Sequence, residues 1–398
     1  MRERGKSGAE KIETTGGKSP LKVLHVIVGL QPGGAETLLY RLVTRSPPEI
    51  EHQIICLAGR DWYSPRFEAE GIHVDHLGVG AGTGLLAANR RLGALIASAE
   101  TDVIQAWMYA PNLLASLWAR SRRIPVVWSI HSSSLGPVGT TSRLFAVAGG
   151  ILARWLAAFV INCSSRSAEV HSKLGYSAAP GAVIANGYDP QAFFPDDKSR
   201  QSARRELGIT DETFLVGTIS RWHPWKDIPT LLRGIRLAND AGVPLRCLLI
   251  GRDLDRENPD LARLIREEGC EDLAIPLGRR SDIQLLARAL DLHLLASRSE
   301  ALPNVVAESM LSTTPNVVTD VGDSALMVGE TGWVVPARDP QALARAIRAA
   351  WRESIDEPVK WQERRSAARR RIEEKFSFEW MAAAYEKIWR EVRDKKAA

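Results

Sequence analysis

Short apolar runs alternate with segments of helical periodicity along most of the chain. In the first half, the apolar runs span residues 21–30, 52–58, 71–77, 102–108, 124–130, 158–164 and 181–186. In the second half they span residues 213–220, 245–251, 274–278, 292–297 and 316–320. Apolar strands that alternate with helices are typical of βαβ units. We therefore predict an α/β chain with a parallel sheet in each half.

The alternation stops at residues 188–201, where Pro, Asp and aromatic residues follow no period, as in an interdomain linker. Residues 340–354 and 361–395 have little strand propensity and are expected to be helical. Two doubly wound, Rossmann-like domains would turn the carboxyl edges of their sheets towards a shared cleft. The predicted division is a disordered tail (1–20), a first domain (21–190), a second domain (191–375) and a C-terminal helix that packs back on the first domain (376–398).

Residues 297–311 (SRSEALPNVVAESML) have the clearest helical pattern next to candidate chemistry. Apolar or small side chains recur at helical spacing, which predicts one buried helix face at Leu302, Val305, Val306, Ser309 and Met310. Pro303 fits the first helical position. The backbone N–H groups of Asn304 and Val305 would then lie at a helix N-terminus, an end that attracts phosphates.

Two glutamates, Glu300 and Glu308, flank this helix start with seven residues between them. The apolar run at residues 292–297 would place Glu300 in the loop at the carboxyl edge of its strand, where open α/β sheets bind ligands. Glu308 lies off the apolar stripe. The alternative is two solvated carboxylates beside an ordinary helix start, since glutamate is common there for dipole reasons.

Gly33 and Gly34 follow the first strand directly and open a helix. Glycines at this position let the backbone approach a ligand phosphate or sugar, although a simple tight turn would also explain them. The pattern is not GxGxxG, so a dinucleotide cofactor is not expected.

Arg221 and Lys226 follow the first strand of the second half, in SRWHPWKD. Two fixed cations at a strand's carboxyl edge suit a leaving diphosphate, and a solvated basic loop is the alternative. His131 ends the fifth strand of the first domain. A lone histidine is more often structural than catalytic, so its role stays open at this point.

Charge and composition narrow the class of partner. The 398 residues carry a formal net charge of +5, and the whole excess lies in residues 1–190, with 19 Lys/Arg against 14 Asp/Glu. A bias of this size fits anionic substrates or an anionic membrane surface. It lacks the clustered runs of nucleic-acid-binding proteins, so no nucleic acid is expected.

The cysteines and the N-terminal segment indicate a cytosolic protein. The four cysteines show no CxxC spacing and mostly lie in apolar runs, which indicates reduced, structural thiols. Residues 1–20 lack the apolar core of a signal peptide, and the apolar stretch at 144–163 is broken by Arg154. The Asp-x-Asp at Asp253 and Asp255 offers too few carboxylates to establish a metal site, so no metal is expected.

Several of these segments together resemble the retaining glycosyltransferases of family 4, which have the GT-B fold. The most specific are residues 296–310 and 317–336, and further matches are residues 32–36, His131, 186–195, 220–227 and 275–283. The resemblance runs from about residue 21 to about residue 350. Ala301 is a departure, because the family usually has glycine there, and another is STTPN at 312–316, where the family often has a small, glycine-containing segment.

The resemblance implies a role for each candidate residue. Glu300 would contact the donor sugar, and Glu308 the ribose. Arg221 and Lys226 would neutralise the diphosphate. The backbone around Leu302, Pro303 and Asn304 would hold the β-phosphate and the sugar, and Val305 is a further candidate for substrate binding. Gly33 and Gly34 would lie near the diphosphate and acceptor, and His131 beside the reacting sugar.

The implied activity is transfer of a sugar from a nucleoside diphosphate donor, with retention, to a glycan or lipid-linked acceptor. We expect no cofactor and no metal, a UDP-sugar rather than a GDP-sugar, and a cytoplasmic enzyme of envelope or exopolysaccharide synthesis that contacts the inner face of the membrane. The alternatives are a nucleotide-sugar epimerase or phosphorylase on the same fold, and a non-catalytic sugar-nucleotide-binding subunit.

Overall fold

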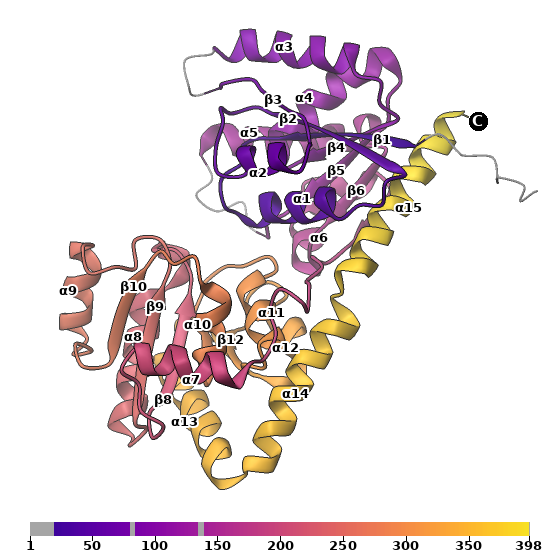
Figure 1. The fold of residues 1–398 in the computed structure, drawn as a ribbon. Helices are drawn as coiled ribbons and strands as arrows, with labels where there is room; N and C mark the ends of the chain where they lie inside the picture. The colour runs from indigo at the N-terminus through magenta and orange to yellow at the C-terminus, as the bar shows by residue number, and fades with distance from the viewer. Residues whose placement is uncertain (1–19, 80–83, 134–138, 398) are drawn as a thin grey trace, which may run out of the picture.

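The computed structural model describes residues 20–79, 84–133 and 139–397. It contains two parallel sheets, each flanked by helices, and confirms the predicted fold class (Figure 1). The predicted tail, apart from residue 20, lies outside the described residues.

The first domain is built on a seven-stranded sheet in the order β3-β2-β1-β4-β5-β6-β7. Its strands are β1 (Leu21–Ile27), β2 (Ile50–Cys56), β3 (Val74–His76), β4 (Val103–Trp107), β5 (Val126–Ile130), β6 (Phe159–Asn162) and β7 (Gly181–Val183). Its helices are α1 (Gly34–Thr44), α2 (Ser64–Ala69), α3 (Leu85–Ser98), α4 (Tyr109–Ala119), α5 (Thr140–Leu156) and α6 (Ser165–Ser172). The strand order reverses between β1 and β4, which makes their carboxyl ends a switch point where ligands bind.

The second domain is built on a six-stranded sheet in the order β10-β9-β8-β11-β12-β13. Its strands are β8 (Phe214–Ile219), β9 (Leu245–Ile250), β10 (Ala274–Gly278), β11 (Leu292–Leu295), β12 (Asn316–Thr319) and β13 (Trp333–Val335). Its helices are α7 (Asp197–Glu206), α8 (Ile228–Asp240), α9 (Pro259–Glu267), α10 (Ile283–Ala289), α11 (Asn304–Leu311), α12 (Ser324–Val328), α13 (Pro340–Asp356) and α14 (Pro358–Lys375). Here β8 and β11 flank the switch point.

The last helix, α15 (Phe378–Ala397), leaves the second domain and lies along the first (yellow in Figure 1). It contributes Met381, Tyr385 and Trp389 to the apolar core between the first sheet and α1. The other face of that sheet packs on α3, α4 and α5. The first domain is therefore completed by a helix from the far end of the chain.

The chain crosses between the domains twice, at neighbouring points. Tyr188 on the way out and Ser377 on the return form a parallel β-bridge. The N–H of Tyr188 donates to the carbonyl of Phe376 at 2.9 Å, and the N–H of Phe378 donates to the carbonyl of Tyr188 at 3.2 Å. A Cβ at Gly187 would lie 2.5 Å from the Cα of Phe378, so this crossing requires glycine.

Three local predictions are wrong in detail. The expected linker over 188–201 already contains the first turn of α7, which Asp196 caps by accepting from two backbone N–H groups. The expected helix over 361–395 is two helices, interrupted at Phe376 and Ser377 where the returning chain pairs with Tyr188. Helix α11 begins at Asn304, so Pro303 is its N-cap rather than its first residue.

Trp389 should anchor α15. Its side chain is buried and its indole N–H donates to Gln105 Oε1 at 2.9 Å. We predict that Trp389→Ala lowers the free energy of unfolding by about 3–5 kcal/mol, through the cavity and the unpaired amide. The control is Trp380→Ala on the same helix, where the indole is 56% exposed and little change is expected. Equal effects in urea unfolding would contradict this anchor.

Candidate functional site

A cavity of about 770 Å³ lies between the domains, at the carboxyl edges of both sheets. From the first domain it is lined by Gln31, Pro32, Gly33, Gly34, Glu36, Asp61 and Trp62. From the second domain it is lined by Ile219, Ser220, Arg221, Lys226, Gly251, Arg252, Arg279 and Val305. Five of the residues predicted from sequence therefore line one cavity: Gly33, Gly34, Arg221, Lys226 and Val305.

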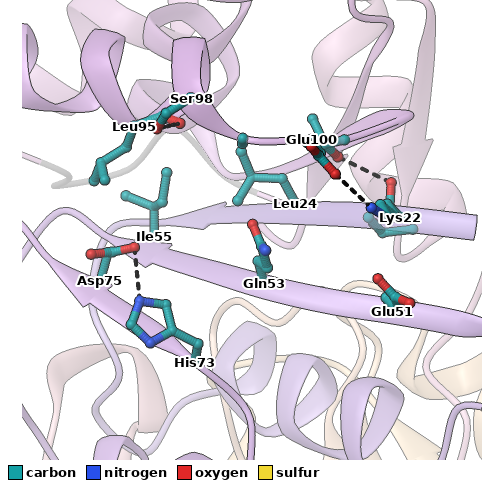
Figure 2. A pocket seen from close by; sticks show the side chains of 13 residues that line it. Lys22, Leu24, Glu51, Gln53, Ile55, His73, Asp75, Leu95, Ser98 and Glu100 are labelled. Carbon is teal, nitrogen blue, oxygen red and sulfur yellow. Dashed lines mark hydrogen bonds and ion pairs between the residues drawn. The ribbon is translucent and has the colours of Figure 1, made fainter.

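Another hollow, of about 390 Å³, lies at the opposite edge of the first sheet, around the start of β1 (Figure 2). Lys22 pairs with Glu100 at 3.0 Å, and His73 pairs with Asp75 at 3.2 Å. First-domain residues alone form it, and none of the predicted site residues lines it.

The loops after β8 and β11 are joined beside the interdomain cavity. Lys226 Nζ lies 2.5 Å from Glu300 Oε1, and Arg298 Nη2 lies 2.6 Å from the buried Asp227. The N–H of Arg298 also donates to the carbonyl of Trp225 at 2.7 Å. Asp227 has φ +49°, a left-handed conformation that costs free energy in a residue other than glycine, and its ion pair with Arg298 offsets that cost. The two loops that supply Lys226 and Glu300 are therefore fixed relative to each other.

The loop of Glu300 is also held from two other sides. Ser133, two residues after His131, donates its hydroxyl to the Glu300 carbonyl. Gly322, with φ +58°, packs so closely that a Cβ there would collide with the carbonyl oxygen of Glu300. Asp323 accepts the N–H groups of Ser165 and Arg166 at the start of α6, at 2.7 and 3.1 Å. These contacts bring the first-domain loops against the second domain around Glu300.

The cavity is dominated by positive charge. Four cations line it, Arg221, Lys226, Arg252 and Arg279, against the carboxylates Glu36 and Asp61. Val305, in the first turn of α11, also lines it, and the first N–H groups of a helix have no partner within the helix. This arrangement favours a multiply charged anion between the two domains.

Glu308 of α11 makes a contact between the domains. Its Oε1 lies 3.2 Å from Arg41 Nη2 of α1, and both side chains are largely buried. Burial raises the pKa of the Glu308 carboxyl, although Arg41 opposes this shift. Glu308 is thus held on the first domain in this structure and is not among the cavity-lining residues.

Leu302, Pro303 and Asn304, at the start of α11, pack against neighbouring residues and do not line the cavity. Leu302 belongs to an apolar cluster with Phe193 and Phe376, and Pro303 is buried. Asn304 Oδ1 accepts hydrogen bonds from Asn186 at 2.9 Å and from Tyr188 at 2.8 Å. The side chain of Asn304 therefore ties α11 to the outgoing crossing of the chain.

His131 lies directly after β5, with its ring stacked on Trp107 at a centroid distance of 5.4 Å. The backbone N–H of His131 donates to the sulfur of Met108 at 3.2 Å. Both ring nitrogens are buried and have no partner among the described residues. Burial lowers the pKa of the ring to about 4. A neutral imidazole with two free nitrogens can exchange hydrogen bonds with ligand hydroxyls.

The prediction from sequence missed several residues. Trp62, just before α2, lies between Arg66 and Arg279, with guanidinium carbons 4.1 and 4.5 Å from its ring centroid. Arg279 comes from the second domain, so this stacking spans the cavity. Glu36, in the glycine motif, also lines the cavity, and burial raises the pKa of its carboxyl. The stacking of Arg279 on Trp62 depends on how the two domains are placed relative to each other, so the sequence alone does not predict it.

The structure offers no resident metal centre in the part it describes: no group of three or more His, Cys, Asp or Glu side chains is placed to hold an ion. Asp255 instead accepts the N–H of Asn258 at 3.1 Å, before α9. In the same described ranges, no helix has both the length and the apolar character to span a bilayer.

Two family models match the chain. Residues 32–192 match the model described as Glycosyltransferase Family 4, and residues 213–353 match Glycosyl transferases group 1. The two matches together cover well over half of the chain. The protein belongs to the family 4 glycosyltransferases. It is a glycosyltransferase, and the resemblance noted in the sequence is confirmed.

A curated relative supports this assignment, and solved structures share the fold. The chain is 27% identical over 311 residues to D-inositol 3-phosphate glycosyltransferase 1 of Catenulispora acidiphila, covering 73% of this chain and 72% of that protein. It is similar in fold to Anabaena HepE, solved with UDP and glucose, with a TM-score of 0.80 and 23% identity over 92% of this chain and 98% of HepE. WaaG, a glycosyltransferase involved in lipopolysaccharide biosynthesis, gives a TM-score of 0.69 and 15% identity over 92% of this chain and 99% of WaaG.

His131 should stay neutral in the folded glycosyltransferase across the physiological pH range. Because burial lowers its pKa to about 4, its ring signals in a labelled NMR sample should not shift between pH 8 and about pH 5.5. Burial also lowers the pKa of His52 and of His293 to about 4. The unfolded rings bind protons near pH 6.5, so stability should be full above that pH and decline as pH falls towards 4. A His131 midpoint near 6.5 would contradict this burial.

Proposed function

We propose that this glycosyltransferase moves a sugar from a nucleoside diphosphate donor to a glycan or lipid-linked acceptor, with retention and without a metal ion. The observation that carries the proposal is the joined pair Lys226–Glu300 beside Arg221, at the edge of a cationic cavity between two sheets. Cations replace the metal that would otherwise neutralise a leaving diphosphate. HepE, which is similar in fold, was solved with UDP and glucose, which favours a UDP-sugar over a GDP-sugar.

The proposed reaction takes place on one face of the sugar. The bond from the anomeric carbon to the diphosphate oxygen breaks while the acceptor oxygen bonds to the same face. The acceptor proton passes to an oxygen of the departing diphosphate. Arg221, Lys226 and the N-terminus of α11 stabilise the growing negative charge. Glu300 and the neutral His131 position the sugar through its hydroxyl groups.

The alternative is a covalent route in which Glu300 attacks the anomeric carbon, as a carboxylate does in retaining glycosidases. In this structure Glu300 Oε1 already accepts from Lys226 at 2.5 Å and from Ser297 at 2.6 Å. Hydrogen bonds of this kind lower the nucleophilicity of a carboxylate, which supports a positioning role. Glu308 would contact the donor ribose after its ion pair with Arg41 breaks, or while it still binds Arg41.

In the cell, the enzyme would act at the cytoplasmic face of the membrane, in envelope or exopolysaccharide synthesis. WaaG acts in lipopolysaccharide biosynthesis, and its similarity in fold supports a surface glycan as the product class. The basic first half of the chain supports an anionic surface nearby.

A thermal-shift screen tests the choice of donor. We predict that UDP-sugars stabilise the protein by about 2.7 kcal/mol at 100 times the dissociation constant, and that GDP-sugars at equal concentration stabilise it less. The matched assay measures free UDP with and without candidate acceptors. Release that needs an acceptor identifies a transferase. Interconversion of donor sugars without an acceptor would instead identify an epimerase, and binding without turnover a silent subunit.

Lys226 should be needed for turnover. We predict that Lys226→Ala lowers kcat by about 10²–10³, because one preorganised contact to the leaving diphosphate is lost. The control is Lys360→Ala, an exposed lysine on α14 paired with Glu353 and Glu357. Near wild-type turnover in Lys226→Ala would contradict its assignment. Mass-spectrometric detection of a glycosyl adduct on Glu300 would replace the one-face route with the covalent one.

A further inference from the structure

His131 lies close to the loop of Glu300, because Ser133, two residues further on, donates its hydroxyl to the Glu300 carbonyl. Both ring nitrogens of His131 are buried, and neither has a hydrogen-bond partner among the described residues. A histidine that acts on a substrate is usually oriented by a hydrogen bond to one nitrogen, which leaves only the other for the substrate. The orientation of the His131 ring must therefore come from packing.

The indole of Trp107 provides this packing. Trp107 is the last residue of β4, and His131 directly follows the neighbouring strand β5. Their rings stack at a centroid distance of 5.4 Å and an interplanar angle of 22°, and Trp107 is fully buried. A stack of this kind holds the plane of the imidazole without using either nitrogen. Both nitrogens of His131 thus stay available for ligand hydroxyl groups.

A hydrogen bond fixes the Trp107 ring in turn. Its indole N–H donates to Nδ1 of the buried His25, on the adjacent strand β1, at 3.2 Å. An indole N–H can only donate, so His25 Nδ1 is the acceptor and the proton of the neutral His25 ring lies on Nε2. That nitrogen donates to His52 Nδ1 at 2.9 Å. Burial holds the pKa of His25 well below its ordinary value, so this chain of hydrogen bonds persists at neutral pH.

The last helix, α15, supports the same ring from the far end of the chain (Figure 1). Tyr385 stacks with Trp107 at a centroid distance of 6.2 Å and an interplanar angle of 12°. The hydroxyl of Tyr385 lies 3.5 Å from Ser129 Oγ on β5. On the same helix, Trp389 donates its indole N–H to Gln105 Oε1, and the amide of Gln105 donates to Ser129 Oγ at 2.7 Å. Helix α15 is therefore bonded to both strands that carry the stacked rings.

Trp128 provides a comparison within the same sheet. It lies on β5, is as deeply buried as Trp107, and donates its indole N–H to Ser116 Oγ at 2.8 Å. It packs in the core on the other face of the sheet, where its ring meets Tyr176. The two tryptophans thus match in burial and in hydrogen bonding, and they differ in that Trp107 contacts His131.

We propose that Trp107 is a positioning residue of this glycosyltransferase. Its indole, supported by Tyr385 of α15, holds the His131 ring so that one nitrogen donates to a hydroxyl of the donor sugar while the other accepts from one. This inference deepens the proposed function and rests on it, because it takes the sugar as the ligand of His131. Trp107 acts only through His131 and does not touch the sugar.

Proton NMR of the His131 ring tests the stack without any ligand, with His131→Ala to assign the signals. In the wild type, the indole ring current should move the carbon-bound protons of this ring clearly upfield. Trp107→Leu should remove that shift, Trp107→Phe should keep part of it, and Trp128→Leu should leave it unchanged. An unshifted His131 ring in the wild type, or the same shift in Trp107→Leu, would overturn the proposal.

Calorimetric titration with UDP-glucose and with UDP tests the role in binding. The ratio of the two affinities measures what the sugar contributes. Trp107→Leu should lower this ratio by about threefold to tenfold, the size of one lost hydrogen bond, and leave the affinity for UDP within about twofold. Trp107→Phe should restore most of the ratio, and Trp128→Leu should not change it. Loss of stability alone would not separate the two leucine variants in this way.

A double variant tests whether Trp107 acts through His131. In the His131→Ala background, Trp107→Leu should not lower the affinity ratio further, because the ring that it positions is gone. A further threefold fall, by about the same factor as in the wild-type background, would contradict this coupling. If Trp107→Leu does not fold, Tyr385→Leu should weaken the upfield shift of the His131 ring, and an unchanged shift would contradict the proposal.

These measurements separate a failure of this inference from a failure of the proposed function. A wild type that shows the upfield shift but binds neither UDP nor UDP-glucose would contradict the proposed donor and leave the stack standing. A wild type that binds UDP-glucose more tightly than UDP, by a ratio that Trp107→Leu does not change, would contradict the positioning role and leave the proposed donor standing.

Discussion

The ion pairs that join the loops after β8 and β11 are the constraint on which the site depends. Lys226 and Glu300 follow β8 and β11, two strands that neighbour each other in the sheet but are distant in sequence, and their side chains meet at 2.5 Å. The ion pair between Arg298 and Asp227 is a second link between the same two loops. These charges therefore fix the two loops relative to each other. Removing Lys226 or Arg298 would leave a largely buried carboxylate unpaired, which costs free energy.

The two domains are held together by contacts of two different kinds. The crossing segments are packed and apolar, with Tyr188, Phe193 and Phe376 in one cluster. Across the cleft the contacts are polar or charged: Ser133 to Glu300, Arg41 to Glu308, and Trp62 against Arg279. Polar contacts can be replaced by hydrogen bonds to water at little net cost in free energy, whereas separating packed apolar side chains is costly. The two domains are therefore held firmly together at the crossing segments, whereas their surfaces at the cleft can separate.

Sequence periodicity recovered most of the fold because most elements bury a continuous apolar run or stripe. Helix α7 was partly missed because Arg200 and Arg204, rather than an apolar stripe, hold it against Asp291. The interruption between α14 and α15 was missed because its cause is a bridge to Tyr188, far away in sequence. No local pattern encodes such a pairing.

The candidate site also combines residues that local sequence predicts with contacts that depend on distant parts of the chain. Gly33, Arg221 and Lys226 could be placed at the cleft because each follows a strand at a carboxyl edge. The pairing of Arg41 with Glu308 and the stacking of Trp62 on Arg279 depend on how the two sheets face each other. Sequence spacing carries no information about that orientation.

The position of α15 has a consequence for how the protein is made. The core beneath β1 is closed by Met381, Tyr385 and Trp389, which are synthesised after every strand of both sheets. Domains usually fold in the order in which they leave the ribosome. Here the domain that emerges first must wait with an open apolar face, beside the buried His25 and the half-buried His52, until the last helix arrives. The second domain can be complete before the first, which inverts the usual order of assembly.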